Sequence, residues 1–256
     1  MRTTDRLTAL VLVAHIAAMF TGFTILADAF QFPDVLRFPA DERLALFRAH
    51  EDVIVPVYWM LAMTGFSQIF IAVLLKRDLA GNAAMLGLVF GVVAGFGQAM
   101  GFGRWAVLVP WLAERMADPA LSDAGRETVA LIEGAFNRYA GMLVGEHLSN
   151  IAWGFWLFFT GAAIHRGDVF DQRVGMAMMC LSPLFGVLAA EQLGLEGPIL
   201  GVLTDFGFPL LALIHFGLAW QLVRRKDGEP APRLGIGAVA VGAVLYAVMV
   251  WPAAAG

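Results

Sequence analysis

The side chains of this sequence that could do chemistry are charged, amide and imidazole groups set within long apolar stretches. A charge at the centre of a bilayer costs roughly 2.5–3.5 kcal/mol on insertion scales, so each of these groups should face protein or water. When their depth is counted from the ends of the apolar stretches at about 1.5 Å per helical residue, these groups fall in one half of a membrane-spanning bundle. The candidates for binding a ligand or an ion are Arg104, Glu146, His147, Asn150, Glu191 and Asp205, with His50, Glu51 and Asp52 at the rim.

Acidic groups outnumber basic ones at this depth. Glu146 shares a helix face with Asn150, four residues away, and Glu191 and Asp205 belong to the same layer. Arg104 is the one basic residue at a comparable depth within the spans, and one arginine cannot neutralise three carboxylates. We therefore expect an outward-facing polar cavity that binds or conducts a cation, a proton or a small ligand. The alternative is that Arg104 pairs with an acid only to hold the bundle together.

The same groups allow a second interpretation, a membrane enzyme. Glu146, His147 and His50 are candidate metal ligands, because carboxylate and imidazole groups bind first-row metals. Together with Glu191 and Asp205 they could also act as general acids and bases. Walker, GxSxG and HExxH motifs are absent from the sequence. The sequence therefore identifies no cofactor, and it favours a protein that is not an enzyme.

Two histidines nearer the cytoplasm suggest a third interpretation. His15 and His215 each lie eight residues from the inner end of an apolar segment, so they reach a matched depth. Two histidines at one depth on antiparallel helices can ligate a b-type haem axially, as in an electron carrier.

Seven apolar segments must position all of these residues. Each is long enough to cross a hydrocarbon core of about 30 Å, which requires about 20 helical residues. Because lipid cannot hydrogen-bond to an exposed backbone, the segments should be helices, and the chain a single integral-membrane domain over residues 1–256. The expected spans are 7–29, 53–75, 83–112, 140–164, 174–195, 199–223 and 234–255. Short surface helices are expected in two longer connections, at 41–48 and from Ser122 onward.

The composition agrees with an all-α, polytopic membrane protein. Hydrophobic residues make up 59% of the 256 residues and charged residues 15%, against about 45–50% and about 25% in soluble domains. The formal net charge of −4 offers no basic surface for nucleic acid. The single cysteine, Cys180, can form neither an intrachain disulfide nor a cysteine-rich metal site.

Basic residues predict the orientation. Ten of the seventeen lysines and arginines fall in short connections on one side, which predicts a cytoplasmic N-terminus and an external C-terminus. The sequence Ala27-Asp28-Ala29 resembles a signal-peptide cleavage site, but the preceding apolar stretch is longer than a signal core, so we expect it to be retained. The ten residues are Arg2, Arg6, Lys76, Arg77, Arg166, Arg173, Arg224, Arg225, Lys226 and Arg233.

One stretch carries a resemblance to a known family. Gly145-Glu146-His147-Leu148, followed by Asn150 and the aromatic run Trp153–Phe159, resembles the bacterial membrane proteins grouped as domain of unknown function 4386. The resemblance implies a multi-spanning protein of the bacterial inner membrane and no established chemistry, so it transfers no residue roles. The partners expected are the lipid bilayer, a cation or small molecule, and, as a further alternative, a larger membrane complex of which this chain is an accessory subunit.

Overall fold

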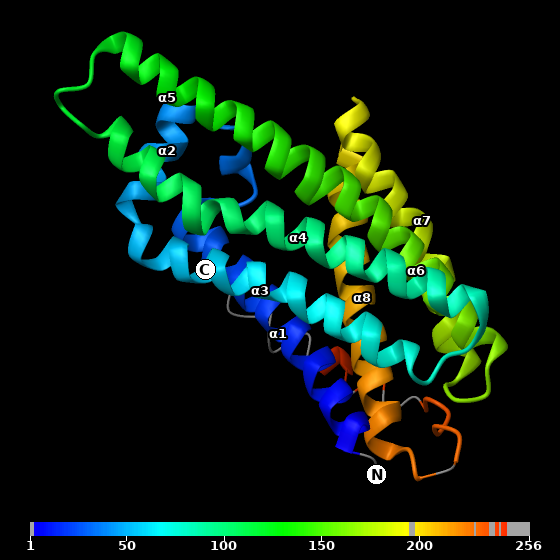
Figure 1. Cartoon of the computed structure of the whole chain (residues 1–256). Helices are drawn as coiled ribbons and strands as arrows, with labels where there is room; N and C mark the ends of the chain where they lie inside the picture. The colour runs from blue at the N-terminus through cyan, green and yellow to red at the C-terminus, as the bar shows by residue number, and fades with distance from the viewer. Residues whose placement is uncertain (1–2, 195–197, 228, 236–238, 241, 245–256) are drawn as a thin grey trace.

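The computed structural model describes residues 3–194, 198–227, 229–235, 239–240 and 242–244, which form helices and connecting loops without a strand (Figure 1). The long helices are α1 (Thr3–Phe30), α3 (Glu51–Lys76), α4 (Gly81–Met116), α6 (Ser149–Arg166), α7 (Gln172–Ala189) and α8 (Pro198–Arg224). Shorter elements are α2 (Ala40–Ala49), α5 (Asp123–Phe136), the 3₁₀ turns η1 (Asp34–Arg37) and η3 (Ala190–Leu193), and the π-helix η2 (Asn137–Leu148).

Within the described residues, five helices are long and apolar enough to cross a membrane: α1, α3, α4, α7 and residues 206–224 of α8. The expected fourth span is divided between η2 and α6, and the fifth ends as an α-helix at Ala189, short of residue 195. Most of the expected seventh span, 234–255, lies outside the described residues. The all-helical class is thus confirmed, whereas the count of seven spans and the orientation stay predictions.

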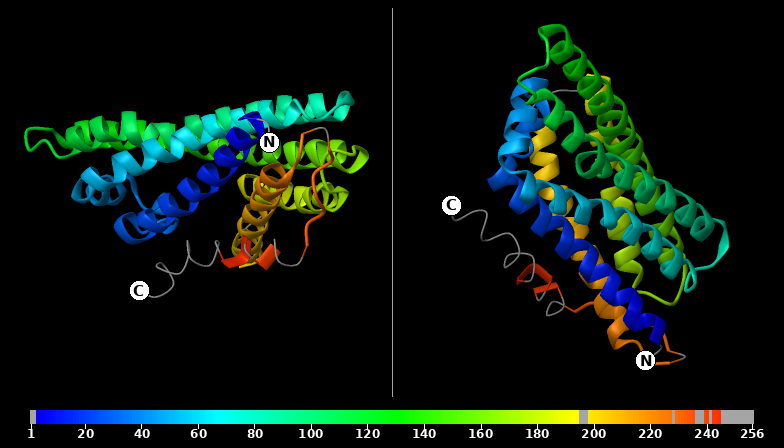
Figure 2. Two further views of the ribbon diagram at one scale, coloured as in Figure 1. Left: turned by 90° about the horizontal axis from the view of Figure 1, so that it is seen from below. Right: turned by 60° about the vertical axis from the view of Figure 1, so that its left-hand side comes forward.

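The long helices close into a ring. Around it α1 packs on α3, α3 on α4, α4 on α6, α6 on α7, α7 on α8, and α8 returns to α1 (Figure 2). Small residues permit the closest approaches: a Cβ added to Gly95 of α4 would lie 2.3 Å from the carbonyl oxygen of Gly65 in α3. Such close backbone contact is typical of helices packed in lipid, where van der Waals packing drives association. The interior of the ring is where polar side chains can be held away from lipid.

One end of the ring is tied by a buried ionic cluster. The guanidinium of Arg225, just after α8, donates to Asp5 of α1 at 2.9 and 3.1 Å and to Asp78 of the α3–α4 connection at 2.9 Å. Burial opposes the charged form, but the hydrogen bonds to Asp78 and Asp5 outweigh it and raise the pKa of Arg225. The cluster joins the first and last of the long helices at the end that carries the N-terminus (Figure 1).

The opposite end is covered by α2 and α5 (Figure 1). Arg43 of α2 and Glu133 of α5 form a bidentate ion pair whose side chains are both buried. Arg43 also donates to the carbonyl oxygens of Leu36 and Phe38, both at 3.0 Å. These bonds hold the connection that follows α1 against the two short helices, and this connection forms one wall of the site described next.

Candidate functional site

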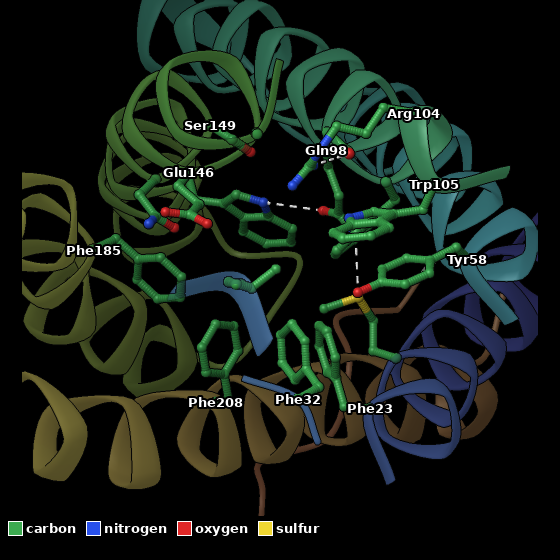
Figure 3. Close-up of a pocket in the computed structure, with 18 of the residues that line it drawn as sticks. Phe23, Phe32, Tyr58, Gln98, Arg104, Trp105, Glu146, Ser149, Phe185 and Phe208 are labelled. Carbon is green, nitrogen blue, oxygen red and sulfur yellow. Dashed lines mark hydrogen bonds between the residues drawn. The ribbon is translucent and has the colours of Figure 1, made fainter. Parts of the chain in front are cut away.

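A cavity of about 180 Å³ opens inside the ring, toward the end that α2 and α5 cover. Its polar side chains come from α4, η2 and α6. Its aromatic floor consists of Phe23 of α1, Phe32 of the α1–α2 connection and Phe208 of α8, as Figure 3 shows. The polar residues are Gln98, Arg104, Glu146, Ser149 and Asn150, and the aromatic residues include Phe23, Phe32, Tyr58, Trp105, Trp153, Phe185 and Phe208. A mostly aromatic cavity with a few convergent polar groups is the usual character of a small-molecule site.

Arg104 is held against one wall of this cavity. Its Nη2 donates to Oδ1 of Asn137 at 2.9 Å, its Nη1 donates to the carbonyl oxygen of Gly101, and its guanidinium carbon lies 4.9 Å from the centre of the Trp105 ring. Gly141 leaves room for this position, since a Cβ there would lie 2.5 Å from Nη2. Several of the donors that an anionic ligand would use are therefore already engaged.

Glu146 lies across the cavity from Arg104 (Figure 3). The charged groups that act on its carboxylate are Arg104, Glu191 and Arg37. Arg37 of η1 forms an ion pair with Glu191 of η3, so a loop arginine supplies positive charge that the sequence argument did not count. The net charge around Glu146 is therefore less negative than the sequence predicted, which was one arginine facing three carboxylates.

The π-helix η2 determines which side chains reach the cavity. A π-helix closes its hydrogen bonds over five residues and turns more slowly than an α-helix, and such segments occur frequently at functional sites. Glu146 and Asn150 both line the cavity. His147 instead faces α7, where its Nδ1 lies 2.8 Å from the carbonyl oxygen of Ala189.

The remaining candidates are not gathered at this cavity. His50 is exposed at the start of α3, and Glu51 and Asp52 line a separate, open hollow with Arg48. The side chain of Asp205 is outside the described part of the chain. Within the described residues, no group of three or more histidine, cysteine, aspartate or glutamate side chains is arranged to hold a metal ion.

Sequence reasoning missed a hydrogen-bonded chain in the cavity wall, which includes the lining residues Gln98 and Trp153. The Nε2 of Gln98 donates to Oγ1 of Thr64 at 2.7 Å, and its Oε1 accepts from Nε1 of Trp153 at 3.3 Å. Tyr58 stacks on Trp105 with ring centroids 5.0 Å apart, and its buried hydroxyl has no hydrogen-bond partner among the described residues. The sequence did contain a signal for Gln98, because it is a single glutamine within the glycine-rich third expected span. The hydrophobic periodicity contained no signal that would identify Tyr58.

The histidines considered as haem ligands do come together. His15 of α1 and His215 of α8 are both buried, and their ring centroids are 5.6 Å apart with planes inclined by 10°. Trp153 and Trp156 of α6 pack beside them.

Comparison with known proteins gives one match. Residues 7–224 match the family described as Domain of unknown function (DUF4386). No curated protein and no solved structure matches the chain.

Proposed function

Since this chain belongs to the DUF4386 family, whose function is unknown, we propose its role from the site: a multi-pass protein whose cavity binds a small organic cation. Five apolar helices support the membrane assignment. Seven spans in the bacterial inner membrane, with the cavity open toward the outer face, form part of the proposal. The excess of lysine and arginine at the opposite end of the ring supports this orientation.

The observation that carries the proposal is a carboxylate set among aromatic rings. Glu146 is the acidic residue of the lining, and Phe32, Tyr58, Trp153 and Phe208 are among the rings around it. Aromatic faces attract cations, by about 0.5–1 kcal/mol at exposed sites and about 2 kcal/mol or more where water is excluded. A cation with apolar substituents would use both the rings and the carboxylate.

Other ligand classes fit this lining less well. A divalent ion that has lost its water shell requires about six or more oxygen ligands, and the lining offers few oxygens among many rings. An anion would need free donors, but Arg104 is already bonded to Asn137 and Gly101 and lies over Trp105. An organic cation therefore agrees best with a lining of many aromatic rings and one carboxylate.

The test compares choline with its neutral isostere 3,3-dimethylbutan-1-ol, using purified protein in detergent. Tryptophan fluorescence is a suitable signal, because Trp105 and Trp153 line the cavity. We expect saturable binding of choline, about tenfold tighter than binding of the neutral compound, since the added charge is worth about 1–2 kcal/mol here. Glu146→Gln should remove that preference, whereas Glu51→Gln, which changes a carboxylate of the separate hollow, should retain it. Equal binding of the two compounds, or a preference that survives Glu146→Gln, would contradict the proposal.

A further inference from the structure

Tyr58 lines the cavity with a hydroxyl group that a carboxylate among aromatic rings does not explain. The side chain is 1% exposed, and its oxygen is a fully buried atom without a hydrogen-bond partner among the described residues. Buried polar side-chain atoms in native proteins are hydrogen-bonded in the large majority of cases, so an unpaired one requires an explanation. Figure 3 shows the hydroxyl end of Tyr58 pointing toward the middle of the cavity.

Neighbouring rings fix the position of this hydroxyl. The ring of Tyr58 stacks on Trp105 with centroids 5.0 Å apart and planes inclined by 12°. It also meets Phe30 edge-on, with centroids 6.2 Å apart, and packs against Phe102 at the same centroid distance. Because a shift of the ring would break these close contacts, a hydrogen-bond partner has to come to the hydroxyl.

Other polar side chains of the lining are already bonded within the protein. Gln98 donates from its amide nitrogen to Thr64 and accepts at its amide oxygen from Trp153. Ser149 donates to the carbonyl oxygen of Ala94 at 3.2 Å. Within the described lining, the tyrosine hydroxyl is the fully buried side-chain atom that lacks a partner. A group that enters the cavity can supply that partner.

Glu146 and the tyrosine hydroxyl border the same space. The charged groups that act electrostatically on Tyr58 are Arg104 and Glu146. In Figure 3, Glu146 enters the cavity from one side and Tyr58 from the other. A ligand in this cavity can therefore contact a carboxylate at one point and an unpaired hydroxyl at another.

We propose that the organic cation bound in this cavity also carries an oxygen atom that hydrogen-bonds to the hydroxyl of Tyr58. The inference rests on the proposed function, because it assigns the positive group of the same ligand to Glu146. A phenol both donates and accepts, so a hydroxyl, ether or carbonyl oxygen can pair with it. The ligand class is thus narrowed from alkylammonium ions in general to amino alcohols and their oxygen-bearing derivatives.

Tyr58 would select its ligand through the hydrogen bond that a poorer ligand cannot make. A cation with a methyl group in place of the oxygen leaves the phenol buried and unpaired, whereas an oxygen-bearing cation pairs with it. The net contribution of one such hydrogen bond corresponds to a factor of about three to ten in affinity.

The experiment uses the full-length protein in detergent and three probes of nearly equal size. Choline has the charge and the hydroxyl, propyltrimethylammonium has the charge alone, and 3,3-dimethylbutan-1-ol has the hydroxyl alone. Isothermal titration calorimetry, with competition for the weaker ligands, measures the affinities. We expect the native chain to bind choline about three- to tenfold more tightly than propyltrimethylammonium. Tyr58→Phe should abolish this difference by weakening the binding of both hydroxyl compounds and not that of propyltrimethylammonium.

Tyr139→Phe is the matched control, since Tyr139 is an exposed tyrosine of η2 that does not belong to the lining. It should retain the native preference. The melting temperature of the ligand-free protein provides a second readout. Tyr58→Phe removes a buried hydroxyl that has no partner, so the variant should melt at the native temperature or above it. A lower melting temperature would show that the hydroxyl has a structural partner and would overturn the proposal.

The binding results separate this inference from the proposed function. Equal affinity of the native chain for choline and propyltrimethylammonium, or a preference that survives Tyr58→Phe, would overturn the inference and leave the organic-cation site intact. Equal affinity for choline and 3,3-dimethylbutan-1-ol, which differ in charge, would instead contradict the proposed function and with it the ligand class inferred here.

Discussion

At the scale of single residues, the contacts of Arg104 and Glu146 bear on two alternative roles of this pair. The pair is either part of a ligand-binding site or a structural ion pair. Arg104 is bonded to Asn137 and Gly101 and stacks on Trp105, so its charge has partners other than Glu146. A buried arginine whose only partner was a carboxylate would depend on that carboxylate for stability. The contacts of Arg104 with Asn137, Gly101 and Trp105 would therefore remain if Glu146 were replaced.

The first prediction follows from these contacts. Glu146→Gln should change the free energy of unfolding by less than about 1 kcal/mol, because the substitution preserves shape and Arg104 retains its other bonds. Thermal unfolding in detergent measures this change. If the residue is instead only the structural partner of Arg104, its removal should cost about 3–5 kcal/mol, and Arg104→Gln should restore the lost stability.

At the scale of elements, glycines set the distance between α3 and α4, which carry Tyr58, Gln98 and Arg104 to the cavity. The contact between Gly95 and Gly65 is backbone to backbone, so no flexible side chain can move to make room. Gly103 of α4, in contrast, has nothing within 4 Å of the position a Cβ would take.

The second prediction uses this pair of glycines on one helix. Gly95→Ala should lower the free energy of unfolding by about 1–3 kcal/mol, the usual cost of overpacking. Gly103→Ala should be neutral or raise it by about 0.5–1 kcal/mol, because alanine favours the helix. Denaturation of both variants in one detergent makes the comparison. Equal stability of the two would show that α3 and α4 do not approach as closely as described.

The third prediction concerns the two helices that cover the cavity end. Glu133→Ala should destabilise the protein by about 3–5 kcal/mol, since it strands the buried charge of Arg43. Glu127→Ala, on the exposed face of the same helix α5, is the matched control and should change stability by less than about 0.5 kcal/mol. Thermal unfolding and limited proteolysis of the α4–α5 connection provide the readouts. If the Glu133→Ala variant retained both the native melting temperature and the native resistance to proteolysis, the Arg43–Glu133 pair would not anchor α2 to α5.

At the scale of the whole molecule, the two ends of the ring differ in charge. The end with the Asp5–Arg225–Asp78 cluster carries the short basic connections, and the other end carries the mixed charges of α2 and α5. In inner membranes lysine and arginine remain in the cytoplasm, so the ring should be oriented with this cluster inside.

The fourth prediction tests that orientation in intact cells. In a Cys180→Ser background, an impermeant thiol reagent applied from outside should label Ser122→Cys, at the start of α5, and not Glu229→Cys, beyond α8. Both positions are exposed, so accessibility within the protein does not bias the result. Permeabilised cells should label at both positions. The reverse pattern in intact cells would invert the orientation and place the cavity toward the cytoplasm.

The sequence by itself determined the family, the helical class and the apolar helices. These properties depend on local composition and periodicity, because an apolar run of about 20 residues can satisfy its backbone in lipid only as a helix. The expected surface helix at 41–48 is α2, at Ala40–Ala49, and the one expected from Ser122 is α5, capped by the Ser122 hydroxyl. Prolines at 33 and 39 and a serine cap are local signals, which a single sequence displays directly.

Only the tertiary structure decided which side chains meet. Periodicity records which face of a helix is polar but not which helix lies opposite, so it could not pair Arg37 with Glu191 or orient His147 toward Ala189. The π-helix η2, the aromatic floor from separate helices and the placement of His15 beside His215 all depend on closure of the ring. Contacts between residues two hundred positions apart arise from packing, and packing is a property of the whole molecule.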